Sequence, residues 1–86
     1  MYTVYYTASW CVPCRTFRPA ATSEIEGRGL KMIAIDVDEY AEGARFDNVM
    51  SVPTVIMFDD QGAELDRVVG ASLPTLKKTL DKLEAR

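Results

Sequence analysis

The sequence predicts a single α/β domain in which helices cover both faces of a four-stranded mixed sheet. Apolar, β-rich runs at residues 1–6, 30–37, 52–58 and 64–69 are separated by segments of helical periodicity or by a turn, which gives the order β-α-β-α-β-β-α. The chain has 86 residues, and 48% of them are hydrophobic. That length supports one hydrophobic core, so we assign residues 1–86 to one domain.

The first half of the chain is predicted to be a strand, a helix and a second strand. Residues 1–6 contain three tyrosines and one valine, which is typical of a strand buried in a sheet. Residues 11–26 carry apolar side chains at three-to-four spacing, and two glycines directly afterwards end this helix. Residues 30–37 are apolar enough to be covered on both faces, as parallel strands usually are. A right-handed crossover therefore leaves the first two strands parallel.

A short second helix is expected at residues 39–47. Asp38 is placed to cap its first turn, and Asn48 is a residue type that tolerates the left-handed conformation at a helix end. The third strand, at residues 52–58, follows directly.

The last part of the chain predicts a strand hairpin and a final helix. Residues 59–62 form the turn, and the alternation in residues 64–69 is weak enough to indicate a strand at the sheet edge. Ser72 is placed to cap the last helix. One apolar stripe identifies the buried face of that helix; its members are Leu73, Leu76, Leu80 and Leu83.

The charge pattern excludes several classes of function. Ten basic residues against 13 acidic residues give a net charge of −3, with no basic run, which argues against nucleic-acid or membrane-surface binding. No apolar stretch is long enough for a membrane span, and no signal-peptide pattern is present. We therefore expect a cytoplasmic protein. The absence of histidine rules out histidine catalysis.

Cys11 and Cys14 are the only cysteines, and they stand where the first strand gives way to a helix. A disulfide between them closes a loop of four residues and would contribute only about 2 kcal/mol to stability in the chain-entropy model. A reversible dithiol is favoured instead, because a helix start lowers the pKa of the first thiol. A structural disulfide and a zinc site remain the alternatives, although two cysteines supply only half of a usual zinc ligand set.

Residues 10–14 read W-C-V-P-C, and residues 51–54 read S-V-P-T. Both motifs resemble those of the thioredoxin superfamily, and the resemblance extends over nearly the whole chain. It implies a minimal thioredoxin fold without the strand and helix that open full-length thioredoxins. The chain is thus similar in size to glutaredoxins and similar in its active-site sequence to thioredoxins.

The resemblance assigns roles to particular residues. Cys11 would attack the target disulfide, and Cys14, one helical turn later, would resolve the mixed disulfide. The Val52–Pro53 peptide would be cis and would face the two sulfurs. An apolar rim would dock partner proteins; its candidate members are Trp10, Val12, Pro13, Val52, Pro53, Gly70 and Ala71. Taken singly, each of these can also be an ordinary packing or turn residue.

Three positions depart from the family pattern. Tyr5 stands where a buried aspartate usually handles the proton of the second cysteine, and Ala34 stands where its lysine companion would be. Losing both together leaves no buried charge unpaired. We expect proton transfer at Cys14 through water or the Tyr5 hydroxyl. Val12 replaces the usual glycine beside the nucleophile, with an effect on redox potential whose direction cannot be derived from the sequence.

The implied activity is the reduction of protein disulfides by a monomer that binds no cofactor or metal. A thioredoxin-reductase-type flavoenzyme would recharge the dithiol with electrons from NADPH, and ribonucleotide reductase is one substrate that the resemblance suggests. Two rivals stay open: a glutaredoxin-like enzyme recharged by glutathione, and a binding module that uses the fold as a docking platform.

Overall fold

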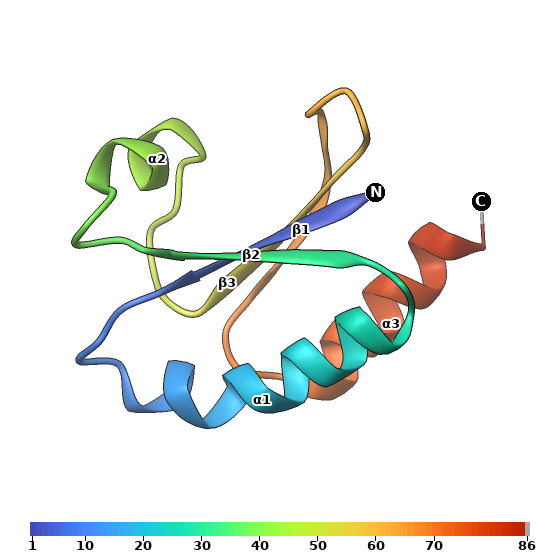
Figure 1. Ribbon diagram of the computed structural model, residues 1–86, viewed down its shortest axis with the longest axis horizontal. Coiled ribbons are helices and arrows are strands. Elements are labelled where there is room, and N and C mark those ends of the chain that lie inside the picture. Colours follow the sequence, from blue (N-terminus) through green and yellow to red (C-terminus); the bar gives the residue numbers. More distant parts are fainter. Residues whose placement is uncertain (86) are drawn as a thin grey trace.

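The computed structural model describes residues 1–85, with residue 46 described by its backbone only. It contains four strands and three helices in the predicted order (Figure 1). Their bounds are β1 Tyr2–Thr7, α1 Val12–Gly27, β2 Lys31–Asp36, α2 Ala41–Phe46, β3 Thr54–Phe58, β4 Glu64–Val69 and α3 Leu73–Glu84. The fold class predicted from the sequence is confirmed.

The four strands form one mixed sheet in the order β2-β1-β3-β4. β1 runs parallel to β2, with Tyr5 opposite Ala34, and antiparallel to β3. β3 and β4 form the predicted antiparallel hairpin, and β4 is an edge strand. β1 is therefore an inner strand that lies directly before the two cysteines.

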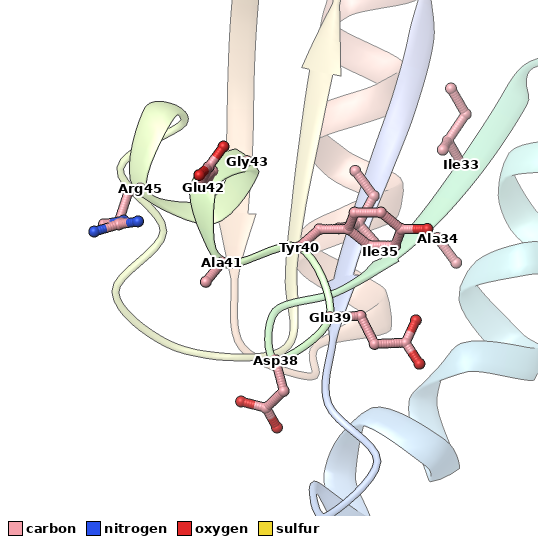
Figure 2. A pocket seen from close by; sticks show the side chains of 10 residues that line it. All are labelled: Ile33, Ala34, Ile35, Asp38, Glu39, Tyr40, Ala41, Glu42, Gly43 and Arg45. Atoms are coloured by element: carbon pink, nitrogen blue, oxygen red, sulfur yellow. The ribbon is translucent and has the colours of Figure 1, made fainter.

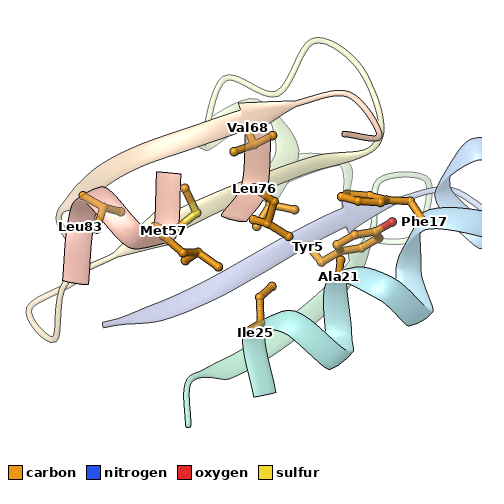
Figure 3. Close-up of a cluster of buried hydrophobic side chains, with 10 residues drawn as sticks. Tyr5, Phe17, Ala21, Ile25, Met57, Val68, Leu76 and Leu83 are labelled. Carbon is orange, nitrogen blue, oxygen red and sulfur yellow. The ribbon is translucent and has the colours of Figure 1, made fainter. Parts of the chain in front are cut away.

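Helices pack on both faces of the sheet. α1 and α3 lie side by side on one face, and α2 lies on the other (Figure 1). Tyr5 belongs to the larger cluster, which α1 and α3 cover (Figure 3). Tyr6 belongs to the smaller cluster, to which α2 contributes Ala44. Consecutive residues of a strand point to opposite faces, so β1 supplies a tyrosine to each cluster.

β2 differs from the prediction that it is covered on both faces. It is the other edge strand, and Lys31, Ile33 and Ala34 are exposed along it. Only the six-residue helix α2 lies over the face to which Ile33 belongs, and Ile33 keeps 39% of its surface exposed. The apolar run correctly indicated a strand, but a local pattern does not specify how many elements cover it.

Two of the three polar residues predicted at helix ends take the predicted places. Ser72 caps α3 by accepting a hydrogen bond from the Thr75 N–H at 3.3 Å. Asn48 adopts the left-handed conformation just after α2, with φ of 60°. The prediction that Asp38 caps α2 is wrong, because the N-cap residue is Tyr40 and makes no side-chain capping bond.

Candidate functional site: a disulfide at a helix N-terminus

Cys11 and Cys14 are joined in a disulfide at the start of α1. Cys11 is the N-cap residue of the helix, and its Sγ accepts a hydrogen bond from the Cys14 backbone N–H at 3.2 Å. Both cysteines are buried: Cys11 is 5% exposed and Cys14 is fully buried. The Cys14 N–H, which has no acceptor within the helix, and the positive end of the helix dipole therefore both point at the sulfur of Cys11.

The S-V-P-T segment lies opposite this disulfide. The Val52–Pro53 peptide is cis, as the resemblance implies, and the Val52 carbonyl oxygen is 3.8 Å from Cys11 Sγ. The Pro53 carbonyl accepts a hydrogen bond from the Gly70 N–H at 2.9 Å. This contact brings the end of β4 beside the loop that faces the sulfurs.

The predicted docking residues lie around two apolar hollows next to Cys11. Trp10 and Val52 line one hollow of about 150 Å³. Val12, Pro13 and Ala71 line the other, of about 460 Å³. Trp10 and Val12 are 65% and 58% exposed, so large apolar side chains stand on both sides of Cys11 in the sequence. Pro53 is buried behind this rim, and Gly70, with φ of 100°, is partly buried.

Tyr5 lies directly behind the disulfide. Its hydroxyl donates a buried hydrogen bond of 2.8 Å to the backbone carbonyl of Cys14, and its ring lies beside Phe17 of α1 (Figure 3). Burial raises the pKa of Tyr5 above its ordinary value, and the charge of Arg18 opposes that rise. Tyr5 is therefore a neutral hydrogen-bond donor at neutral pH, and its proton points at the carbonyl of Cys14 in the oxidised state. Ala34 is exposed on β2.

Two contributors to the site were not predicted from the sequence. Asp38 accepts a hydrogen bond from Trp10 Nε1 at 2.8 Å and so fixes the exposed indole. Met50 is 90% exposed and lines the same hollow as Trp10. The position of Met50, directly before the S-V-P-T motif, is a signal in the sequence that could have identified it. The first contact joins residues 28 positions apart and leaves no local pattern.

A larger hollow, of about 790 Å³, lies away from the cysteines between β2 and α2 (Figure 2). Ile33, Ile35 and Tyr40 contribute its apolar surface, and neither cysteine lines it. Within the described residues, no cluster of three or more histidine, cysteine or acidic side chains is arranged to hold a metal. None of the helices described is both long and apolar enough to cross a membrane.

Comparison with known proteins identifies one family. The thioredoxin family model matches residues 1–82. A thioredoxin H-type from Oryza sativa subsp. indica is 42% identical over 78 residues, which are 90% of this chain and 63% of that protein. The mitochondrial thioredoxin-2 of Schizosaccharomyces pombe is 34% identical over 82 residues, which are 94% of this chain and 61% of that protein. The chain thus spans about three fifths of the length of these relatives.

Solved structures show the same fold. Thioredoxin from Schistosoma mansoni superposes with a TM-score of 0.87 at 32% identity, over 94% of this chain and 74% of that one. Thioredoxin 1 from Thermosipho africanus TCF52B superposes with a TM-score of 0.90 over 99% of this chain and 96% of that one. Its identity is 23%, so it supports the fold alone.

Proposed function

Because the chain belongs to the thioredoxin family, we propose that it reduces disulfide bonds in other proteins through Cys11 and Cys14. One observation carries the proposal: the two sulfurs are bonded to each other at the N-terminus of α1, where the Cys14 N–H points at Cys11 Sγ. In the reduced protein the same N–H and the helix dipole favour the thiolate of Cys11, which is the reactive form of the thiol.

The exchange proceeds in two steps. The Cys11 thiolate attacks one sulfur of the substrate disulfide; the substrate S–S bond breaks, a mixed disulfide forms and the first substrate thiolate leaves. Cys14 then loses its proton and attacks Cys11 Sγ, so that the internal disulfide forms and the second substrate thiolate leaves. Two electrons pass from the cysteine pair to the substrate. The internal disulfide described here is the product of the second step.

The apolar rim supports a protein substrate. We propose that an extended segment of the substrate lies beside Val52 and pairs with its backbone, as an added strand would. The exposed side chains of Trp10, Val12, Pro13 and Ala71 would then contact the substrate on either side of its disulfide. Gly70 has no side chain to obstruct this approach.

The proton of Cys14 is the one part of the reaction for which the family's usual group is missing. We propose that Tyr5 passes this proton, since its hydroxyl is already within hydrogen-bond distance of the Cys14 backbone. The raised pKa of Tyr5 excludes a permanent phenolate base. The hydroxyl would therefore act as a relay: turned from the Cys14 carbonyl to the thiol, it would accept the thiol proton and release its own to a water molecule that enters the site.

For the remaining cycle we propose a monomer in the cytoplasm, a reducing compartment suited to a dithiol donor. A thioredoxin-reductase-type flavoenzyme would return two electrons from NADPH to the Cys11–Cys14 disulfide, and ribonucleotide reductase is one proposed substrate. No cofactor need bind to the chain itself, since the flavin belongs to the reductase. Supplying either glutathione or such a reductase with NADPH separates this cycle from that of a glutaredoxin.

Trapping with cysteine variants tests the proposal. Cys14→Ser keeps the nucleophile but lacks the resolving thiol, so it should accumulate a mixed disulfide with a protein substrate that non-reducing electrophoresis detects and a reductant reverses. Cys11→Ser is the matched control and should trap nothing. Equal trapping by both variants, or by neither, contradicts the assigned roles. Full biological activity of the double variant would support the docking-platform rival instead.

A further inference from the structure

The loop at residues 48–53 carries Val52, the rim residue whose backbone lies against Cys11. It joins α2 to β3 and presents Val52 to Cys11 at 3.8 Å, yet Met50 within it is 90% exposed. Its far end is held where Thr54 Oγ1 donates to the Ser51 carbonyl at 2.8 Å. Its near end passes through Asn48 with φ of 60°, in the left-handed region that asparagine enters more readily than most non-glycine residues. We call this segment the docking loop.

Arg67, from the edge strand β4, holds the near end of the docking loop. Its Nη2 donates to the Asp47 carbonyl at 2.7 Å, and its Nη1 donates to the Asn48 carbonyl at 3.3 Å. These carbonyls lie just beyond the end of α2, where no helical N–H follows to satisfy them. The same guanidinium is fixed by both carboxylate oxygens of Glu64, at 2.6 and 2.7 Å. Because Glu64 already holds the planar guanidinium, Arg67 loses little further conformational entropy when it binds the loop.

Tyr6 holds the same point from the sheet. Its hydroxyl donates to the Asp47 carboxylate and lies 3.2 Å from the Gly43 carbonyl. Burial, followed by the bond to Asp47, raises the pKa of Tyr6, so the hydroxyl keeps its proton for this contact. Asp47 is thus bound through its carbonyl by Arg67 and through its side chain by Tyr6.

We propose that Arg67 is a positioning residue for disulfide exchange with protein substrates. By fixing the start of the docking loop, it sets where Val52 and the hollow beside Trp10 stand relative to Cys11. The inference rests on the proposed function and adds a determinant of substrate class to it. A folded protein substrate must contact the loop to deliver its disulfide. A small disulfide needs only the sulfur of Cys11, so its reaction does not depend on Arg67.

The test compares two substrates in one variant. Arg67→Met keeps the aliphatic stem and removes the fork. We expect its KM for insulin, a protein disulfide, to rise about tenfold with kcat within about twofold, as for a lost binding interaction. We expect kcat/KM for the small disulfide 5,5′-dithiobis(2-nitrobenzoate) and the reduction potential to stay at the wild-type values. Arg45→Met, on an exposed arginine of α2, is the matched control and should change neither substrate.

Two further variants separate positioning from stability. Arg67→Lys can donate to one of the two carbonyls at most and should give an intermediate KM for insulin. Tyr6→Phe retains the ring and should raise that KM by a smaller factor. All assays are run below the measured melting temperature of each variant. A change in Arg67→Met that is equal for both substrates, or absent for insulin, overturns the inference. Failure of the wild type to reduce either substrate refutes the proposed function itself.

Discussion

Replacing Tyr5 with phenylalanine should destabilise the oxidised protein by about 1–2 kcal/mol. The variant keeps the buried ring, which packs against Phe17 with centroids 6.2 Å apart, and loses only the hydroxyl. That hydroxyl makes a buried bond of 2.8 Å to the Cys14 carbonyl. A buried hydrogen bond has a net value of about 1 kcal/mol, and a carbonyl left with one donor fewer raises the cost. For a domain of this size, the loss corresponds to a fall in Tm of about 4–16 °C.

Urea unfolding followed by the fluorescence of Trp10 measures this loss, and a thermal melt followed by circular dichroism checks it. Tyr2→Phe is the matched control, because the Tyr2 hydroxyl donates no hydrogen bond within the described residues while its ring stacks on Phe58. We expect that control to remain within about 0.5 kcal/mol of the wild type. Equal stability of Tyr5→Phe and wild type would refute the reasoning, since the bond would then contribute nothing.

The same variant tests the proton relay. If Tyr5 passes the proton of Cys14, Tyr5→Phe should slow the resolving step more than the first attack, which rapid-mixing kinetics with a mixed-disulfide substrate can separate. Neither protein should show the carboxylate titration expected of a buried aspartate, because Tyr5 stands in that position. A carboxylate-type pH profile in both proteins would rule out the relay.

Three other substitutions probe the fold and its charges. Leu80→Ala removes a fully buried side chain between α3 and the sheet and should cost about 2–5 kcal/mol in urea unfolding, whereas less than about 1 kcal/mol would contradict the packing described. Glu64→Gln should make the free energy of unfolding less dependent on pH at the acid end. The Arg67 guanidinium holds the pKa of Glu64 below its ordinary value of 4.5, so the ion pair stabilises the fold above that pH, and its contribution is lost as pH falls through the folded-state pKa. The same loss of stability in acid for the variant and the wild type would contradict this. Arg28→Met breaks one ion pair with Glu24 of α1 and two that link the end of α1 to α3, with Asp81 and Glu84. We expect a loss of about 1 kcal/mol that shrinks in about 1 M salt, and a salt-independent loss would contradict the ionic origin.

Local patterns in the sequence predicted the elements well. The predicted bounds of β4 are those observed, and Ser72 and Asn48 occupy the predicted positions at helix ends. Each of these features depends on residues within a few positions of one another, such as a side chain that accepts from the N–H three residues on. Strand and helix periodicity is likewise a local property, so it can be read from one sequence.

The errors and omissions concern contacts between distant segments. Asp38 has the chemistry of a helix cap, but its carboxylate binds the Trp10 indole, 28 residues earlier. The apolar run of β2 has the pattern of a covered strand, but only the folded topology places it at an edge. The contact of Arg67 with the docking loop has no motif, since the two loop carbonyls lie 19 and 20 residues away in the sequence.

The two cysteines and the family resemblance led to the proposed chemistry, but the hydrogen bond of Tyr5 required the structure. The sequence has a tyrosine at the position of the usual aspartate. That identity alone does not tell whether the hydroxyl approaches the sulfur or the carbonyl of Cys14, because those atoms belong to the same residue. The orientation is set by how α1 lies on β1.

Consecutive tyrosines of β1 connect the central strand to both halves of the site. From one face, Tyr5 grips the first turn of the helix that carries the disulfide; from the other, Tyr6 grips the chain where it leaves α2 for Val52. Neighbouring residues of a strand share one backbone, so the first turn of α1 and the chain that leads to Val52 are both anchored to β1. Hydrogen bonds from one strand thus hold the disulfide and the start of the loop opposite it in a fixed relative position.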